Sequence, residues 1–114
     1  MPHCIIEYSH DVAEQVSIDD LIAATHQGAM SSGLFEEYDI KTRAIAYRQH
    51  RTGQTQDSFV HVTVRLLYGR DEQQKSLLSE NLLAAIEPLL SNVASVGVEI
   101  CDMHRESYRK RVLS

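Results

Sequence analysis

The sequence predicts an α+β fold with the element order β-α-β-β-α-β, in which one four-stranded mixed sheet carries two helices on one face. Two strand–helix–strand units follow each other along the 114 residues, a length that predicts a single domain, 1–114. The only clear polar loop, residues 51–57, separates the two units. Because a strand–helix–strand crossover is right-handed, both helices are expected on the same face of the sheet.

The first unit begins with a short apolar run, residues 3–9, which is typical of a strand. Ser17 and Asp20 have the spacing of a capping box, with Asp in place of the usual Glu, so a helix is expected to begin there. Gly33 is expected to be its C-cap. A second strand is predicted over residues 39–50. The apolar stripe of the helix consists of Leu21, Ile22, Thr25, Ala29 and Met30.

The second unit contains the clearest strand signal, a period of two over residues 59–66. A second helix is expected after Gly69, with two acidic residues near its positive N-terminal end. Pro88 falls inside the helical pattern and removes a backbone hydrogen bond, which predicts a kink or break. Residues 96–101 form the predicted fourth strand, and the tail from Arg105 is polar and basic.

The second face of this sheet would remain uncovered by helices. It is expected to carry alternate residues of the third strand, or their neighbours if the register slips by one. These alternate residues are Phe59, His61, Thr63 and Arg65. A face that carries both phenylalanine and arginine is an awkward surface for a monomer, so association into a closed ring, a homotrimer, is predicted.

The charge is unevenly distributed along the chain. The net charge of −5 argues against nucleic acid as a partner. Residues 41–70 nevertheless contain six basic residues and one acidic residue, a local charge of +5. Such a basic centre can focus a small anion while the rest of the protein stays acidic, although two arginine-rich polar strand faces would explain it equally well.

Other composition features argue against several classes of protein. No stretch approaches the roughly 18 apolar residues of a membrane helix, and no secretory signal is recognisable at the N-terminus. Cys4 and Cys101 are expected to be reduced, which is typical of a cytoplasmic protein. Neither the cysteines nor the six histidines have the spacing of metal ligands, so no metal is expected.

Pro2 is the residue with the most chemical interest. Methionine is normally removed before a small residue such as proline, which would leave the chain with a secondary amine at its start. An α-amino group has a pKa of about 8 in model peptides. Burial or nearby cations lower that pKa, and an amine poised near neutral pH can act as a general base. The alternative is that Pro2 only begins a strand, where its missing N–H costs nothing.

Four segments resemble the 5-carboxymethyl-2-hydroxymuconate isomerases, a branch of the tautomerase superfamily. They are residues 1–8, 39–43, 59–63 and 68–70, and the resemblance fades after about His104. It implies a tautomerase-like fold and a cofactor-free isomerase of aromatic-compound degradation, as in the breakdown of homoprotocatechuate. It also implies that Pro2 moves a proton from the enol oxygen to carbon in a small anionic 2-hydroxymuconate-type dienol carboxylate.

The resemblance implies substrate-binding roles for three cations. It places an arginine at Arg70, whose alternative role is that of a surface residue beside a helix. Arg43 matches the family segment, whereas Lys41 stands where the family has arginine. Lysine keeps the charge but lacks the planar fork that grips a carboxylate with two bonds, so this change affects the expected substrate more than the chemistry.

Three other functions are compatible with the same pattern. The chain could be a tautomerase with another dicarboxylate substrate, because related enzymes use the same proline. It could be a non-enzymatic trimeric binding or signalling module on the same fold, since fold does not determine function. A ferredoxin-like regulatory domain has the same element order but a different strand order.

Overall fold

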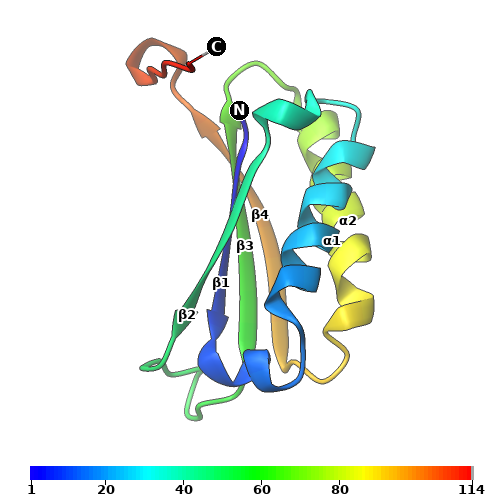
Figure 1. Cartoon of the computed structure of the whole chain (residues 1–114), viewed down its shortest axis with the longest axis vertical. Coiled ribbons are helices and arrows are strands. Elements are labelled where there is room, and N and C mark those ends of the chain that lie inside the picture. Colours follow the sequence, from blue (N-terminus) through cyan, green and yellow to red (C-terminus); the bar gives the residue numbers. More distant parts are fainter. Residues whose placement is uncertain (114) are drawn as a thin grey trace.

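The computed structural model describes residues 1–113, and in that part of the chain four strands form one mixed sheet. The strands are β1 (His3–Ser9), β2 (Lys41–Tyr47), β3 (Phe59–Leu67) and β4 (Ser95–Met103). Their order is β2-β1-β3-β4. Helices α1 (Ile18–Ser31) and α2 (Glu72–Ile86) lie side by side on one face (Figure 1). The predicted α+β fold is therefore confirmed.

The pairing of the strands excludes the ferredoxin-like alternative. β1 pairs in parallel with β2, and β3 pairs in parallel with β4, so each strand–helix–strand unit is continuous in the sheet. The two units meet through the antiparallel pair of β1 and β3. A ferredoxin-like sheet would instead separate the two strands of a unit by another strand.

Local sequence determines where α1 begins and ends. The Ser17 hydroxyl accepts a hydrogen bond from the Asp20 amide at 3.3 Å and so caps the first turn. The helix ends at Ser31, with Ser32 as C-cap. Gly33 follows with a φ of +73°, a left-handed conformation that glycine adopts without steric cost. The C-cap is therefore Ser32, one residue before the predicted Gly33.

Helix α2 begins with a full capping box. The Asp71 carboxylate accepts a hydrogen bond from the Gln74 backbone N–H at 2.8 Å. The side-chain oxygen of Gln74 accepts one from the Asp71 backbone N–H at 3.0 Å. The α-helix ends at Ile86 and a short 3-10 helix, Glu87–Leu89, follows. The predicted break at Pro88 is confirmed, because proline cannot continue the backbone hydrogen bonding.

Two strand boundaries differ from those predicted. Strand β2 is shorter than the predicted 39–50, since Asp39 belongs to the 3-10 helix Glu37–Asp39 and the strand ends at Tyr47. Strand β4 is longer than the predicted 96–101, because it pairs with β3 along its whole length, from Ser95 opposite Phe59 to Met103 opposite Leu67. Strand length is decided by the partner strand, which the local pattern does not contain.

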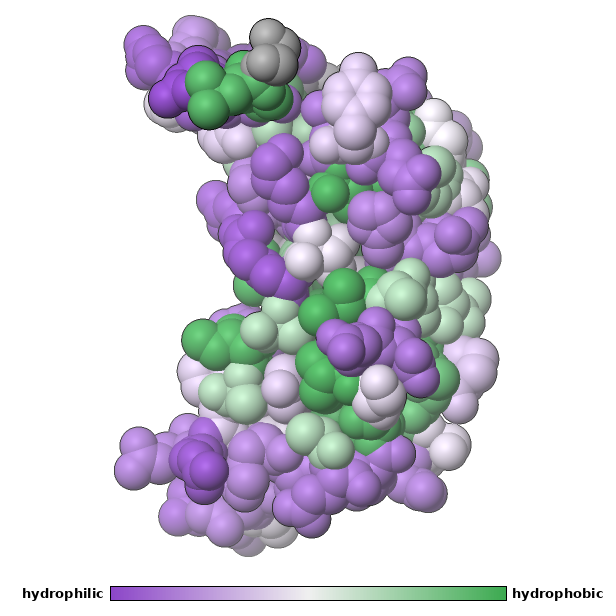
Figure 2. Space-filling view, in the orientation of Figure 1, coloured by the Kyte–Doolittle hydropathy of each residue, from purple (hydrophilic) through white to green (hydrophobic). Residues whose placement is uncertain are grey.

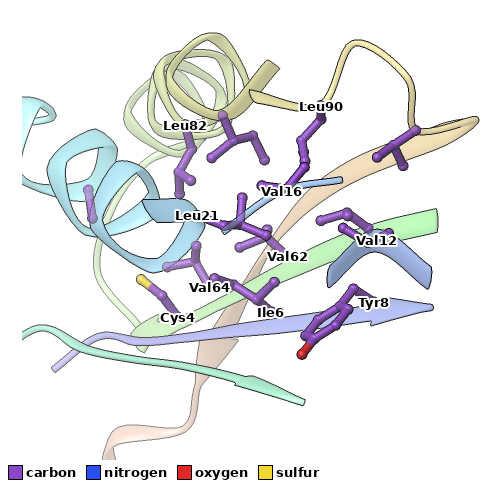
Figure 3. Packing of buried hydrophobic residues seen from close by; sticks show 14 of the residues in the cluster. Cys4, Ile6, Tyr8, Val12, Val16, Leu21, Val62, Val64, Leu82 and Leu90 are labelled. Atoms are coloured by element: carbon purple, nitrogen blue, oxygen red, sulfur yellow. The ribbon is translucent and has the colours of Figure 1, made fainter. Parts of the chain in front are cut away.

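The core lies between the sheet and the helices (Figure 3). Alternate residues of β1 and β3 point into it, and the third strand has the predicted register because a slip by one residue would expose its valines. Core side chains from the sheet and the helices include Ile6, Val62, Val64, Leu21, Leu78 and Leu82. The opposite face carries Phe59, His61, Thr63 and Arg65. Figure 2 shows the molecule hollowed on the side opposite the helices.

Two leucines of α2 provide a matched test of this core. Leu82 is fully buried, whereas Leu77 is 54% exposed. Leu82→Ala is expected to lower the free energy of unfolding by about 2–5 kcal/mol, because it removes buried surface and leaves a cavity. Leu77→Ala should change it by less than about 0.5 kcal/mol. Urea unfolding measures both, and equal losses would contradict the described packing.

Within residues 1–113, neither α1 nor α2 nor any of the 3-10 helices has the length and apolar character of a membrane span.

Candidate active site

The N-terminal residues are held against the start of β2. The Pro2 carbonyl accepts a hydrogen bond from the Lys41 amide at 3.0 Å, so Pro2 extends the parallel pairing of β1 and β2. The Met1 amine donates to the Asp39 carbonyl at 2.9 Å and lies 3.9 Å from an Asp39 carboxylate oxygen. Met1 and Pro2 are both buried. Backbone pairing therefore fixes the position of the chain's first nitrogen atoms.

A cavity of about 480 Å³ opens beside this N-terminus. Its size is within the range of pockets that hold small ligands. It is formed by the first residue, the segment before β2, the β3–α2 connection and the C-terminal segment. The lining residues are Met1, Asp39, Leu67, Arg70, Arg105, Tyr108 and Lys110. One carboxylate faces three side-chain cations, so the cavity suits an anionic ligand.

The surroundings of the N-terminal amine favour its neutral form. Burial is the largest cause that lowers the pKa of the Met1 amine below its usual value of 8.0. Asp39 opposes this shift, whereas Lys110, Lys41 and Arg70 add to it through their positive charge. The structure therefore places two of the predicted cations, Lys41 and Arg70, close enough to influence this amine.

Arg70 is held in a defined position at the cavity wall. Its guanidinium donates to the Leu67 carbonyl at 3.3 Å and to the Leu34 carbonyl at 3.0 Å. Its central carbon lies 5.3 Å from the centroid of the Phe35 ring, which is a cation–π contact. A guanidinium has five N–H donors, so further donors remain for a carboxylate.

The other two predicted cations are separated from Arg70 in different ways. The Lys41 ammonium donates to the Asp39 carbonyl at 3.3 Å. Arg43 instead contacts His3, with 3.0 Å between its Nη1 and the His3 Nδ1. Arg43 lines an adjacent cavity of about 590 Å³ on the open sheet face, together with His3, Arg65 and Tyr108. The three predicted cations therefore do not line one common cavity.

The C-terminal segment contributes cavity residues that sequence reasoning did not assign. Arg105 donates through Nε to the Tyr68 carbonyl at 3.1 Å, and the Lys110 ammonium lies 3.4 Å from the Asp39 carboxylate. The basic character of the tail was the only signal in the sequence. It does not show that this tail returns to the N-terminus.

Metal-binding side chains are not grouped in the described chain: residues 1–113 contain no cluster of three or more histidine, cysteine or acidic residues that could hold an ion. His61 and Glu99 form a pair at 2.7 Å on the open sheet face. The charge that the candidate site offers to a ligand comes from lysine and arginine side chains.

Comparisons with known proteins match almost the whole chain. A family model described as 5-carboxymethyl-2-hydroxymuconate isomerase matches residues 2–102. The 5-carboxymethyl-2-hydroxymuconate Delta-isomerase of Escherichia coli is 25% identical over 111 residues, which cover 91% of this chain and 88% of that protein.

Solved structures show the same fold. The 5-carboxymethyl-2-hydroxymuconate isomerase from Deinococcus radiodurans R1 superposes with a TM-score of 0.85 at 20% identity, over 96% of this chain and 88% of that chain. A structure described as a fused 4-OT wild type asymmetric trimer gives a TM-score of 0.72 at 14% identity, over 95% of this chain and 91% of that chain. The segment after residue 102 lies outside the family match.

Proposed function

Since residues 2–102 match its model, the chain belongs to the 5-carboxymethyl-2-hydroxymuconate isomerase family of the tautomerase superfamily, and we propose that it isomerises a 2-hydroxymuconate-type dienol carboxylate with Pro2 as base. The chain is thus an isomerase by family. The observation that carries the finer proposal is the position of the N-terminus. Met1, which directly precedes Pro2, borders a cationic cavity, and its surroundings lower the pKa of the Met1 amine.

The proposed reaction begins with the neutral Pro2 amine, which becomes available when Met1 is removed. Pro2 accepts the proton of the substrate's 2-hydroxyl group, and the electrons of the O–H bond remain on the resulting dienolate. Pro2 then delivers the same proton to a carbon of the conjugated system, which yields the conjugated 2-oxo product. No proton is gained or lost overall, so the reaction needs a single acid–base group with a pKa near neutrality.

Three cations are proposed to bind the substrate. Arg70, fixed by two backbone carbonyls and Phe35, would hold a carboxylate through its remaining N–H donors. Lys41 would add a positive charge close to the base. Arg43 would bind the same anionic substrate from the neighbouring cavity on the open sheet face. Preorganised positive charge stabilises the dienolate, on which negative charge develops.

A homotrimer is proposed to bury the open face of the sheet. That face exposes large apolar side chains beside its charged ones, with Ile45 and Tyr47 on β2 both accessible. The hollow in Figure 2 lies on the same side of the molecule. One structural relative is described as a trimer, which supports the same arrangement here. Sedimentation of the purified protein would reveal the assembly state, and a monomer would contradict this part of the proposal.

The test of the proposed function is turnover of 5-carboxymethyl-2-hydroxymuconate, an intermediate type expected in homoprotocatechuate breakdown. Its conversion to the 2-oxo isomer shortens the conjugated system and is followed by ultraviolet absorbance. After Met1 is removed, the Pro2 amine is expected to have surroundings like those of the Met1 amine. The value of kcat/KM should then rise with pH through a Pro2 pKa below the usual 8.0, because only the neutral amine is a base. Rapid turnover of other dicarboxylate dienols alone would change the substrate assignment.

A further inference from the structure

The C-terminal segment, residues 104–110, turns back toward the N-terminus. A 3-10 helix, Arg105–Ser107, reverses the chain directly after β4, and the Tyr108 amide donates to the His104 carbonyl at 3.2 Å. Lys110 pairs with Asp39 at 3.4 Å, so the segment contacts the residues before β2. Figure 1 shows the C-terminal segment at the same end of the molecule as the N-terminus. The segment is therefore part of the wall of the candidate site.

Arg43, His3 and Tyr108 form a chain of hydrogen bonds that orients the tyrosine. Arg43 Nη1 lies 3.0 Å from His3 Nδ1, and His3 Nε2 lies 3.0 Å from the Tyr108 hydroxyl oxygen. Arginine can only donate, so His3 Nδ1 is the acceptor and the ring hydrogen of the neutral imidazole is on Nε2. His3 therefore donates to Tyr108, and the hydroxyl hydrogen of Tyr108 remains available for another acceptor.

The charge state of His3 agrees with this arrangement. Burial, followed by the positive charges of Arg43 and Lys41, lowers the pKa of His3 below its usual value of 6.5. His3 is consequently neutral at pH 7, as an Nδ1 acceptor requires. The Tyr108 hydroxyl group can both accept the His3 hydrogen bond and donate its own hydrogen.

We propose that Tyr108 donates a hydrogen bond to the substrate's C2 oxygen, and that His3 and Arg43 are positioning residues that aim this hydroxyl group. Tyr108 lines the N-terminal cavity together with Arg70, and it also lines the adjacent cavity that contains Arg43. It thus lies where the two cavities meet. The inference rests on the proposed function and adds a residue from outside the family match at residues 2–102.

The chemical role of this donor follows from the reaction. The C2 oxygen carries the negative charge after Pro2 has taken its proton, and it becomes the 2-oxo oxygen of the product. A fixed O–H donor stabilises that charge more than it stabilises the neutral hydroxyl group of the substrate. Tyr108 keeps its own proton throughout, so the proton balance of the isomerisation is unchanged.

The first test is Tyr108→Phe, which removes only the hydroxyl group. The expected result is a loss of about 10²-fold in kcat with little change in KM, the effect of removing one donor to a developing oxyanion. Tyr38→Phe is the matched control, because Tyr38 is 83% exposed and does not line either cavity. Unchanged kcat in Tyr108→Phe, with the control also unchanged, would overturn the proposal.

The positioning role has its own readout in a double-mutant cycle. If His3 aims the hydroxyl group, Tyr108→Phe should cost much less kcat in a His3→Ala background than in the unmodified protein. His3→Gln, whose side-chain amide can both accept and donate, should restore part of the loss. Full additivity of the two losses would show that His3 does not act through Tyr108.

A binding measurement separates this inference from the proposed function. The probe is 2-hydroxyterephthalate, whose aromatic ring prevents tautomerisation, and terephthalate is the same dicarboxylate without the hydroxyl oxygen. The unmodified enzyme should bind the hydroxylated probe about 3- to 10-fold more tightly, and Tyr108→Phe should lose that preference. If dienols are not turned over but the preference depends on Tyr108, the proposed function fails and the Tyr108 contact stands. A preference that survives Tyr108→Phe overturns the contact.

Discussion

Inserting one glycine between Met1 and Pro2 is expected to abolish turnover, with kcat/KM falling by about 10²–10⁴-fold or more. The insertion turns the Pro2 nitrogen into an amide, which has no basic lone pair. The Lys41 amide would still pair with the Pro2 carbonyl, so the fold near β2 is preserved. Mass spectrometry would establish which residue begins each purified chain, and the ultraviolet assay would measure turnover.

Pro2→Ala is the informative companion to this insertion. It keeps a free amine at the same place after methionine removal, although a primary amine replaces the secondary one. The loss should therefore be smaller than the loss caused by the inserted glycine. If the extended chain isomerises the dienol as fast as the chain that begins at Pro2, the base is another group and Pro2 only begins strand β1.

Arg70→Ala is expected to lower kcat/KM by about 10²–10³-fold. Arg70 is the predicted cation that lines the same cavity as the N-terminus, and its position is fixed by the Leu34 and Leu67 carbonyls. The loss should appear in both KM and kcat, since the guanidinium would hold a carboxylate in the substrate and balance the dienolate charge. Steady-state kinetics with the dienol substrate measures both quantities.

Two further variants separate the role of Arg70 from general charge and from folding. Arg70→Lys keeps the charge but loses the planar fork, so it should recover only part of the activity. Arg51→Ala removes an exposed arginine of the β2–β3 loop and should leave turnover unchanged. Thermal unfolding of Arg70→Ala shows whether the loss reflects the fold. An Arg70→Ala enzyme with unaltered kinetics would contradict the substrate-binding role.

Lys41 stands where the family segment has arginine, and the structure shows what surrounds this lysine. Its ammonium donates to the Asp39 carbonyl, and its charge acts on the terminal amine. A lysine can therefore support the base without gripping a carboxylate by two bonds. Arg43, by contrast, contacts His3, which in turn contacts Tyr108. Under the proposal for Tyr108, this link is how an arginine outside the N-terminal cavity would act on the reaction.

The sequence by itself determined the elements of this fold and their order. Caps at Ser17 and Asp71, the period of two in β3 and the break before Pro88 all depend on residues within a few positions of one another. The right-handed crossover then places both helices on one sheet face. The place of Pro2 directly after Met1, together with the family resemblance of the N-terminal segment, likewise depends only on neighbouring residues.

Only the tertiary structure decided the lengths of β2 and β4 and the composition of the cavity. The contact between His3 and Tyr108 spans 105 positions of the chain, and the pair of Lys110 and Asp39 spans 71. Such contacts leave no periodicity in the sequence, because each depends on where the whole sheet places two distant segments. Strands β1 and β4 bring residue 1 and residues 105–110 to the same end of the molecule, so the basic C-terminal segment lines the candidate site.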